Sequence, residues 1–489
     1  MLRIISGLSL LSLMLAAIFL SGCGGDSTEP SSNSIIGQVL LDGETDHSGI
    51  TIAVYATPQD SELEAIRHQY PQTGMSLSNP LFDHRFHTPL ATIETDADGN
   101  FKISGLSIAE YIVVAFKSDF GFRYFYYQIP GARNDWPVNV ALYPETPLSG
   151  SLTNGYTFES EHHYIVTQNL WLTGSQTFVF EPGAWFRIDP NMTVDVSAPI
   201  SLQGNAQSPF HITSNDGLTA FSQGLDPAGL SKYYQVKLGS DAQPQGGIIE
   251  WGLFSLGQKG LDVQVNSVTM RNCLLEHCFN GVVFSLVQEA HCTNLLVRDN
   301  NHTGAIGIAF ETLETGSLAH NVILGNATGM KVQTHYMGSI EDNLFQSNTT
   351  GLEFNQTVST INNNEFYQNS YVDVLFSHNQ NPTTDELTVH HNVFGSNSSM
   401  RSRELNQFYS PSMLHINYNE FNSSAWFIYL YGYGGDEDVN ARYNYFDGLN
   451  SESDIKERVW DRDDDNVAPF APIVDVSYFY TTPPDAGIR

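Results

Sequence analysis

The stretch from Trp251 to Phe446 decides the fold because it repeats one short motif nine times. The motif reads WGL at 251, NCL at 272, NLL at 294, NVI at 321, NLF at 343, NEF at 364, NVF at 392, NEF at 419 and NYF at 444. Successive motifs lie 21, 22, 27, 22, 21, 28, 27 and 25 residues apart. Repetition at this period is typical of a solenoid, in which each repeat forms one coil and packs on its neighbours.

The coils are predicted to be β. Leucine-rich repeats have a similar period but need several leucines per repeat, whereas the run Gly351-Leu352-Glu353-Phe354 alternates apolar and polar residues as a short strand does. Coils of strands stack about 4.8 Å apart, so an asparagine that recurs at one position can bond to the amides above and below it. An inward-facing structural column is therefore predicted at Asn272, Asn294, Asn321, Asn343, Asn364, Asn392, Asn419 and Asn444.

A second column follows five residues after the first. It comprises His277, Asp299, Asn326, Asn348, Asn369 and Asn397, and after it come Gly281, Gly304, Gly329 and Gly351. Because Asn and Gly tolerate a left-handed backbone, we expect this column to form sharp corners.

At these residues the chain resembles the right-handed parallel β-helix family with pectate-lyase-like repeats, whose coils carry N-x-F followed by N-x-x-G. The resemblance covers roughly residues 150–480 and implies an all-β fold, with a right-handed parallel β-helix over 150–450 and a C-terminal cap over 451–489. The superfamily includes lyases, hydrolases, epimerases, phage adhesins and non-enzymatic surface proteins, so the fold implies no single activity.

Residues 1–23 have a basic start and an apolar run, which predicts a secretory signal. Their end, Leu20-Ser21-Gly22-Cys23, resembles the lipobox of bacterial lipoproteins, which implies a lipid on Cys23. Gly24 occupies the second position of the mature chain, where an aspartate would resemble the inner-membrane retention signal. The resemblance therefore favours the outer membrane, on either its periplasmic or its surface face. Residues 24–34 are predicted to be a flexible tether.

The chain is strongly acidic, with 53 Asp and Glu against 21 Lys and Arg and a net charge of −32. This charge excludes binding to nucleic acid, which needs a positive surface. No cofactor is expected, although calcium stays open as an alternative. Asp96 and Asp98 are interpreted as a hairpin turn, and Asp461, Asp463 and Asp465 as part of the cap, because neither loop has the closing Glu of a calcium site. Cys273, Cys278 and Cys292 are interpreted as buried apolar side chains.

Residues 35–145 are predicted to form a small Ig-like β-sandwich, because short alternating strands are separated by turn signals. The run TDADGNFKISGLSIAEYIVVAF, from Thr95 to Phe116, resembles the carboxypeptidase-regulatory-like domain, which implies a spacer or binding module. The insertion from Pro58 to Pro89 contains His68, Asp83, His84 and His87. Their spacing is a poor match to zinc sites, so no metal site is predicted.

No catalytic residue is predicted. A lyase needs a base beside a group that neutralises the uronate, and a hydrolase needs two carboxylates at one cleft. One outward column is expected to contain Asp262, Val283, Ala309, Lys331, Glu353 and Leu375. A solvated ion pair between Lys331 and Glu353 explains these two residues without chemistry, while Lys331 with His335 is the candidate base of a lyase alternative.

Aromatic residues indicate a binding surface. In the run from Trp426 to Tyr433, strand alternation places Ile428 and Leu430 inside. Phe427, Tyr429, Tyr431 and Tyr433 are then expected outside, where sugar rings could stack on them. The alternative is that the C-terminal cap covers this row.

These observations favour a non-catalytic, lipid-anchored protein of the cell envelope that binds an extended polysaccharide along its solenoid. A polysaccharide lyase or glycoside hydrolase with a site on the flank is the first alternative, because a site assembled from several coils would escape a search by spacing. A structural envelope spacer is the second.

Overall fold

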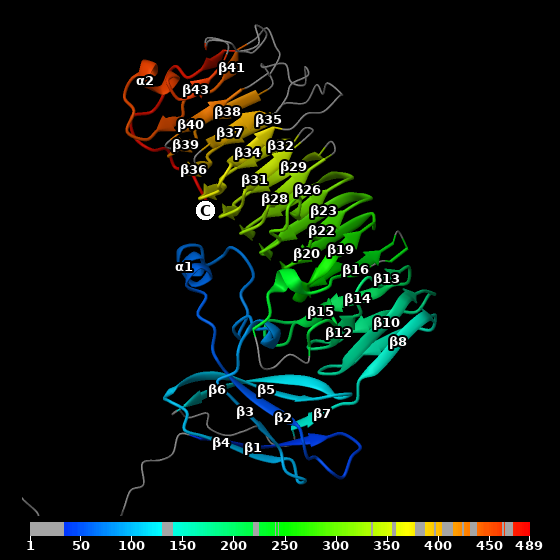
Figure 1. Ribbon diagram of the computed structural model, residues 1–489. Helices are drawn as coiled ribbons and strands as arrows, with labels where there is room; N and C mark the ends of the chain where they lie inside the picture. The colour runs from blue at the N-terminus through cyan, green and yellow to red at the C-terminus, as the bar shows by residue number, and fades with distance from the viewer. Residues whose placement is uncertain are drawn as a thin grey trace, which may run out of the picture.

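The computed structural model describes residues 34–129, 140–218, 224–239, 241–242, 244–333, 336–354, 358–376, 387–395, 398–402, 414–422, 425–430, 438–461, 464 and 473–489. Over these residues the chain is all-β, with two small sheets followed by a long parallel solenoid (Figure 1). This confirms the predicted fold class. No helix in the described ranges is long and apolar enough to span a membrane.

The N-terminal unit has a three-stranded sheet in the order β4-β1-β7 and a four-stranded sheet in the order β3-β2-β5-β6. Alternate residues of both sheets face one shared hydrophobic core, to which β1 contributes Ile35 and Val39 and β5 contributes Val113. The elements are β1 (Ser34–Leu41), β2 (Thr51–Ala56), α1 (Ser61–Gln69), η1 (His84–Phe86), β3 (Ala91–Glu94), β4 (Asn100–Ser104), β5 (Ala109–Lys117), β6 (Gly121–Ile129) and β7 (Val140–Leu142).

The solenoid has three faces, which we number in the order in which each coil visits them. Face 1 is a 13-stranded parallel sheet. Its strands are β9 (Tyr156–Phe158), β11 (Phe178–Phe180), β14 (Ile200–Gln203), β17 (Pro244–Glu250), β20 (Ser267–Arg271), β23 (Val287–Thr293), β26 (Leu313–Ala319), β29 (Tyr336–Glu341), β32 (Val358–Asn362), β35 (Leu387–His390), β38 (Leu414–Asn417), β41 (Val439–Asn440) and β44 (Val474–Asp475).

Face 2 begins with the first half of β10 and continues through short strands that pair in parallel. Its strands are β10 (His163–Leu172), β12 (Trp185–Ile188), β15 (Phe210–Ser214), β18 (Gly252–Ser255), β21 (Leu274–Glu276), β24 (Leu296–Arg298), β27 (Val322–Leu324), β30 (Leu344–Gln346), β33 (Glu365–Tyr367), β36 (Val393–Gly395), β39 (Glu420–Phe421) and β42 (Tyr445–Phe446).

Face 3 begins with β8, which pairs with β10, and includes the second half of β10. Its further strands lead to the C-terminal helix α2 (Glu452–Lys456) and end at β43. They are β8 (Thr146–Leu152), β13 (Thr193–Val196), β16 (Tyr233–Leu238), β19 (Gly257–Val263), β22 (Asn280–Phe284), β25 (Ile306–Phe310), β28 (Thr328–Val332), β31 (Thr350–Phe354), β34 (Val372–Phe376), β37 (Ser398–Ser402), β40 (Trp426–Tyr429) and β43 (Val459–Trp460). The short 3-10 helix η2 (Pro227–Gly229) precedes β16.

An asparagine ladder lines the corner between faces 1 and 2. Its members are fully buried, and the Nδ2 of each donates to the Oδ1 of the next at 2.8–3.1 Å. They are Asn321, Asn343, Asn364, Asn392, Asn419 and Asn444. The predicted inward column is confirmed at these six positions.

The prediction was wrong at Asn272 and Asn294. Strand pairing places Cys273 and Leu295 at the ladder position, one residue later in each coil. Asn272 and Asn294 have φ values of 53° and 54°, so they supply the left-handed turn just before the ladder position. The residue before the ladder position therefore bends the backbone, and the residue at the ladder position fills the interior.

The second corner, between faces 2 and 3, shows the same division. Asn300, Asn326, Asn348 and Asn369 form a buried ladder with amide-to-amide bonds of 2.9–3.0 Å. The expected left-handed backbone is found at His277 and Asp299, each with a φ of 55°. It is wrong for Asn326, Asn348 and Asn369, where the left-handed residue is the one before, Gly325, Ser347 or Gln368. Asn397 lies outside the described residues.

The glycines of the repeats are required by close packing. A Cβ on Gly281, Gly329 or Gly351 would lie 2.5–2.6 Å from a carbonyl oxygen of the next coil, and none of these three has a left-handed φ. Gly307 belongs to this column and Gly304 does not, since Gly304 has a φ of 82°. The expected left-handed role is therefore wrong for the three aligned glycines.

Face 2 is covered by the insertion between β2 and β3. Leu63 and Ile66 of α1 pack on an apolar strip of face 2 formed by Leu274, Leu296, Val322 and Leu344. The C-terminal segment meets the same face, since Gly487 N–H donates to His391 O at 2.8 Å. Figure 1 shows α1 and the C-terminus side by side along the solenoid.

Candidate functional site

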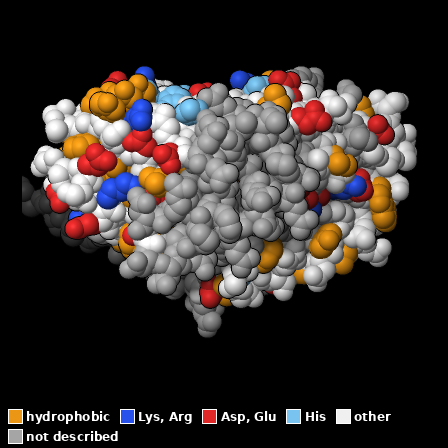
Figure 2. All heavy atoms as spheres, turned by 90° about the horizontal axis from the view of Figure 1, so that it is seen from above, with side chains coloured by type: hydrophobic (Ala, Val, Ile, Leu, Met, Phe, Trp, Pro, Cys, Tyr) orange, Lys and Arg blue, Asp and Glu red, His pale blue; other side chains and the backbone are white. Residues whose placement is uncertain are grey.

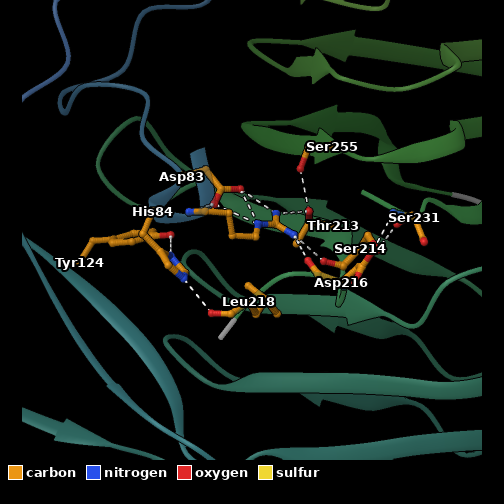
Figure 3. Close-up of polar contacts among 10 residues, drawn as sticks. Asp83, His84, Tyr124, Thr213, Ser214, Asp216, Leu218, Ser231 and Ser255 are labelled. Carbon is orange, nitrogen blue, oxygen red and sulfur yellow. Dashed lines mark hydrogen bonds and ion pairs between the residues drawn. The ribbon is translucent and has the colours of Figure 1, made fainter. Parts of the chain in front are cut away.

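The histidines of the insertion lie in two different settings. His68 is exposed on α1, whereas His84 and its neighbour Arg85 are buried where the insertion meets the solenoid (Figure 3). His84 Nδ1 lies 2.8 Å from the Tyr124 hydroxyl, and its Nε2 lies 3.1 Å from Leu218 O. Both ring nitrogens of His84 are therefore engaged within the protein.

Arg85 is the centre of the polar contacts at this junction. Its guanidinium pairs with Asp83 at 2.6 Å and donates to Thr213 Oγ1 at 2.7 Å and Ser214 O at 2.8 Å. Burial raises the pKa of Asp83, but the Arg85 charge and hydrogen bonds outweigh it and lower the pKa to about 2. Burial also lowers the pKa of His84 to about 4. This junction therefore joins the insertion to the solenoid through a buried ion pair and hydrogen bonds.

Strand pairing confirms the register of the column on face 3 from Asp262 to Leu375. The column is not open to solvent, however, because all its members except Lys331 are buried. Lys331 Nζ lies 2.9 Å from Glu353 Oε1, so the predicted ion pair is present, but it is largely buried and not solvated as expected. The Lys331 ammonium is thus engaged by a carboxylate of the next coil. His335 lies outside the described residues.

Two acidic residues of face 3 approach one hydroxyl. Ser285 Oγ lies 2.6 Å from Asp262 Oδ1 and 3.2 Å from Glu311 Oε2. Asp262 also pairs with Lys259 at 3.1 Å and is only 3% exposed. The residues sit on three successive coils, which explains why spacing along the sequence did not bring them together.

The aromatic run at β40 is only partly outward. Phe427 is fully buried in the solenoid core, so its expected place outside is wrong. Strict alternation fails because Phe427, Ile428 and Leu430 are all buried here, where the last coils close. Tyr429 is half-buried and stacks on Trp460 with ring centroids 5.6 Å apart. Tyr431 and Tyr433 lie outside the described residues.

Arg401 reinforces this outer stack. Its guanidinium carbon lies 5.0 Å from the ring centroid of Tyr371 and 4.9 Å from that of Tyr429, so the cation is held between two rings. Such contacts stabilise a desolvated cation. They also take up the Tyr429 ring faces, one with Arg401 and one with Trp460.

A different aromatic row is open to solvent, and we call it the tyrosine ladder. It consists of His391, Tyr418, Tyr443 and Tyr478, whose successive ring centroids are 5.4, 5.8 and 6.2 Å apart with interplanar angles of 14°, 10° and 23°. Tyr418, Tyr443 and Tyr478 are 38%, 40% and 68% exposed. Tyr480, 37% exposed, lies beside Tyr418 and Tyr443.

All four ladder residues occupy the left-handed position of the corner between faces 1 and 2. Their φ values run from 55° to 60°. Bulky residues seldom adopt this conformation, which costs an L-residue other than Gly or Asn about 1–2 kcal/mol. Other coils place Asn272, Asn294 and Asn363 there. Trp251 and His320 take the same position in two other coils, so this corner accepts several bulky side chains.

Neighbouring rings of the ladder are nearly parallel and laterally displaced. Flat contact brings atoms to about 3.5–4.0 Å, whereas these centroids are 5.4–6.2 Å apart with nearly parallel planes, so neighbouring rings are offset. Seen from above, the C-terminal end shows hydrophobic, histidine and charged side chains along its margin (Figure 2).

Sequence reasoning missed this ladder because it aligned the asparagines and not the residue before them. The signal was present as His391, Tyr418 and Tyr443, each directly before the Asn of motifs 392, 419 and 444. Tyr478 could not be aligned, since the residue after it is Phe479 and the motif is absent.

A family model described as "Periplasmic copper-binding protein (NosD)" matches residues 253–394, about three tenths of the chain. No curated protein and no solved structure matches significantly. The matched segment contains the best-aligned coils of the solenoid.

The described residues do not fit a copper ion. Among them, no three His, Cys, Asp or Glu side chains cluster closely enough to hold a metal. His390 and His391 lie with their Nδ1 atoms 2.7 Å apart, so the two rings bond to each other. Burial raises the pKa of the Cys273 and Cys278 thiols to about 12, which opposes the thiolate form that binds metals.

Proposed function

We propose that this chain is a non-catalytic β-helix protein of the bacterial cell envelope that binds an extended polysaccharide on the tyrosine ladder. The carrying observation is that Tyr418, Tyr443 and Tyr478 form a solvent-exposed row of nearly parallel rings, one from each coil. Sugar rings have apolar faces that pack on aromatic faces, and hydroxyl edges that remain in water. A row of such rings offers successive subsites to one straight polymer.

The envelope location rests on two observations. The basic and apolar N-terminus ends at Leu20-Ser21-Gly22-Cys23, which predicts export and a lipid on Cys23. The matching family is described as periplasmic. Together they support a lipid-anchored protein of the cell envelope, and Gly24 favours the outer membrane.

The test removes ladder rings without straining the backbone. Tyr418→Asn and Tyr443→Asn introduce the residue that the chain itself uses at the equivalent corners Asn272 and Asn294. Each ring contact contributes about 0.5–1.5 kcal/mol, so we expect the double variant to bind a retained polysaccharide about 5- to 150-fold more weakly in affinity electrophoresis.

Two control variants separate this site from other aromatic residues. Tyr234→Asn removes a ring that is 51% exposed but stands outside the ladder, and it should leave retention unchanged. Tyr429→Ala tests the row at β40 and should also leave it unchanged. Equal retention of wild type and the Tyr418→Asn/Tyr443→Asn variant would contradict the proposal.

A glycoside hydrolase is a second candidate, favoured by the approach of Asp262 and Glu311 to Ser285. Such enzymes use two carboxylates at one cleft. Release of reducing sugar from a retained polymer, abolished by Asp262→Asn or Glu311→Gln, would establish it. Release of unsaturated uronates that depends on Lys331 would instead establish a lyase.

A further inference from the structure

We infer that the ligand of the tyrosine ladder is a neutral, straight polysaccharide of the β-1,4-linked type, bound along the solenoid axis with one sugar per ladder ring. This inference rests on the proposed function and names its ligand class. It is carried by three separate properties of the ladder: its direction, its spacing and the charges around it.

The direction follows from the corner. His391, Tyr418, Tyr443 and Tyr478 occur once per coil at one corner, so their rings follow the line along which the coils stack. A chain that contacts all of them must run parallel to the solenoid axis. A polymer that bends or coils within a few residues would leave the row.

The spacing selects an extended chain. Successive ring centroids are 5.4, 5.8 and 6.2 Å apart, somewhat more than the strand spacing of about 4.8 Å that sets the coil repeat. A fully extended β-1,4-linked pyranose chain advances by a similar distance per residue. Each sugar can therefore meet one ring, which gives four subsites from His391 to Tyr478.

The charges select a neutral polymer. The two arginines beside the ladder are each paired, Arg442 with Asp475 and Arg489 with Asp485. Arg442 also lies over the Tyr478 ring, 5.7 Å from its centroid. The whole chain carries a net charge of −32, which repels a polymer with one carboxylate per sugar.

The hydroxyl groups fit the same ligand. Three of the four ladder rings end in a phenol that can donate and accept a hydrogen bond, and Tyr480 adds a fourth hydroxyl nearby. Neutral sugars offer hydroxyls of the same kind on their ring edges. Stacking would then give affinity, while the hydroxyls would set the register of the chain.

The experiment uses a length series of neutral β-1,4-linked glucan and chitin oligosaccharides, titrated calorimetrically into the full chain. Affinity should rise with each added sugar up to about four residues and then level off, because the ladder has four rings. Tyr418→Asn/Tyr443→Asn should abolish the length dependence, and Tyr234→Asn should preserve it. Added salt should change the affinity little, since no net charge is neutralised.

Parallel titrations separate the inference from the proposed function. If polygalacturonate or alginate binds more tightly than the neutral oligomers, with loss on added salt and in the ladder variant, the neutral class is overturned while polysaccharide binding by the ladder stands. Preference for a β-1,3-linked glucan, or affinity that keeps rising well beyond four sugars, overturns the straight four-subsite arrangement. Binding of none of these polymers overturns the proposed function itself.

Discussion

Arg85, in the insertion of the N-terminal unit, donates from Nη2 to Thr213 Oγ1 on β15 of the solenoid at 2.7 Å, with both side chains buried. Thr213 Oγ1 in turn lies 2.7 Å from Ser255 Oγ on the next coil. The insertion is thus attached to two coils through one guanidinium group. Because the Asp83 carboxylate pairs with the Arg85 guanidinium, the attachment buries no unpaired charge.

Arg85→Leu should destabilise the chain by about 3–5 kcal/mol, because it leaves the largely buried Asp83 carboxylate without its ion-pair partner. The measurement is the free energy of unfolding in denaturant. Asp83→Asn combined with Arg85→Leu removes the stranded charge, so the pair should cost less than the sum of the single changes. Additive costs would show that the two side chains do not act as a pair.

Acid should weaken the same junction through His84. Burial lowers the pKa of His84 in the folded chain to about 4, below the usual 6.5. Between these two pH values the unfolded state binds a proton that the folded state does not bind. Stability from His84 is fully present above pH 6.5 and is lost as the pH falls towards about 4. We expect the melting temperature to fall over this range, and to fall less in His84→Gln. An identical pH profile in the variant would exclude His84 as the cause.

The asparagine ladder should contribute measurably to stability. Asn343→Leu strands the amides of Asn321 and Asn364, which bond to Asn343 at 2.8 and 2.9 Å, and should cost about 1–3 kcal/mol. Asn272→Gly is the control: its φ of 53° suits glycine, so it should cost only a few tenths of a kcal/mol. Comparable losses in both variants would mean that register within the coil does not matter.

Close packing of the coils can be tested at glycine. Gly329→Ala places a Cβ 2.6 Å from Gly351 O and 2.9 Å from Ile323 Cγ2, and overpacking of this kind costs about 1–3 kcal/mol. Gly229→Ala meets no atom within 4 Å and should be neutral or slightly stabilising. Thermal unfolding of the two variants gives the comparison. A stable Gly329→Ala protein would require coils farther apart than described.

Cys23 is expected to carry the lipid anchor, since it follows Leu20-Ser21-Gly22 at the end of the apolar run. Metabolic labelling with a palmitate analogue should mark the wild-type protein and not Cys23→Ser, which should leave the membrane fraction. A Cys23→Ser protein that is still labelled and membrane-bound would contradict the lipobox prediction.

The coils were predictable because their spacing is imposed by a physical repeat. Residues such as Asn343 and Phe345 recur in the interior of each coil, and stacking of Phe345 on Phe366 at 4.8 Å preserves them at one register. The N-terminal unit is likewise seen as two small sheets. The register within a coil was harder to predict. Asparagine occurs both at the left-handed corner and in the ladder. Asn294 and Asn321 therefore look equivalent in sequence, although their backbone conformations differ.

The site was harder to predict because its members come from separate coils. Tyr418 and Tyr443 are 25 residues apart in the chain but stack at 5.8 Å. Phe427 could not be placed by alternation, because the last coils bury both sides of β40. The covering of face 2 was also hidden, since α1 and the C-terminal segment reach it from opposite ends of the sequence.

The hydrogen bond between Tyr70, just after α1, and Glu365 on β33 joins residues 295 positions apart. In an ordinary solenoid each coil touches only its neighbours, so heat or force peels coils from an open end one after another. Here Tyr70 and Ile488 pack in one cluster with Leu63, so the final segment is tied to the beginning of the folded chain. Unfolding from the C-terminal end must first break these contacts. We therefore expect a single cooperative transition in place of gradual fraying.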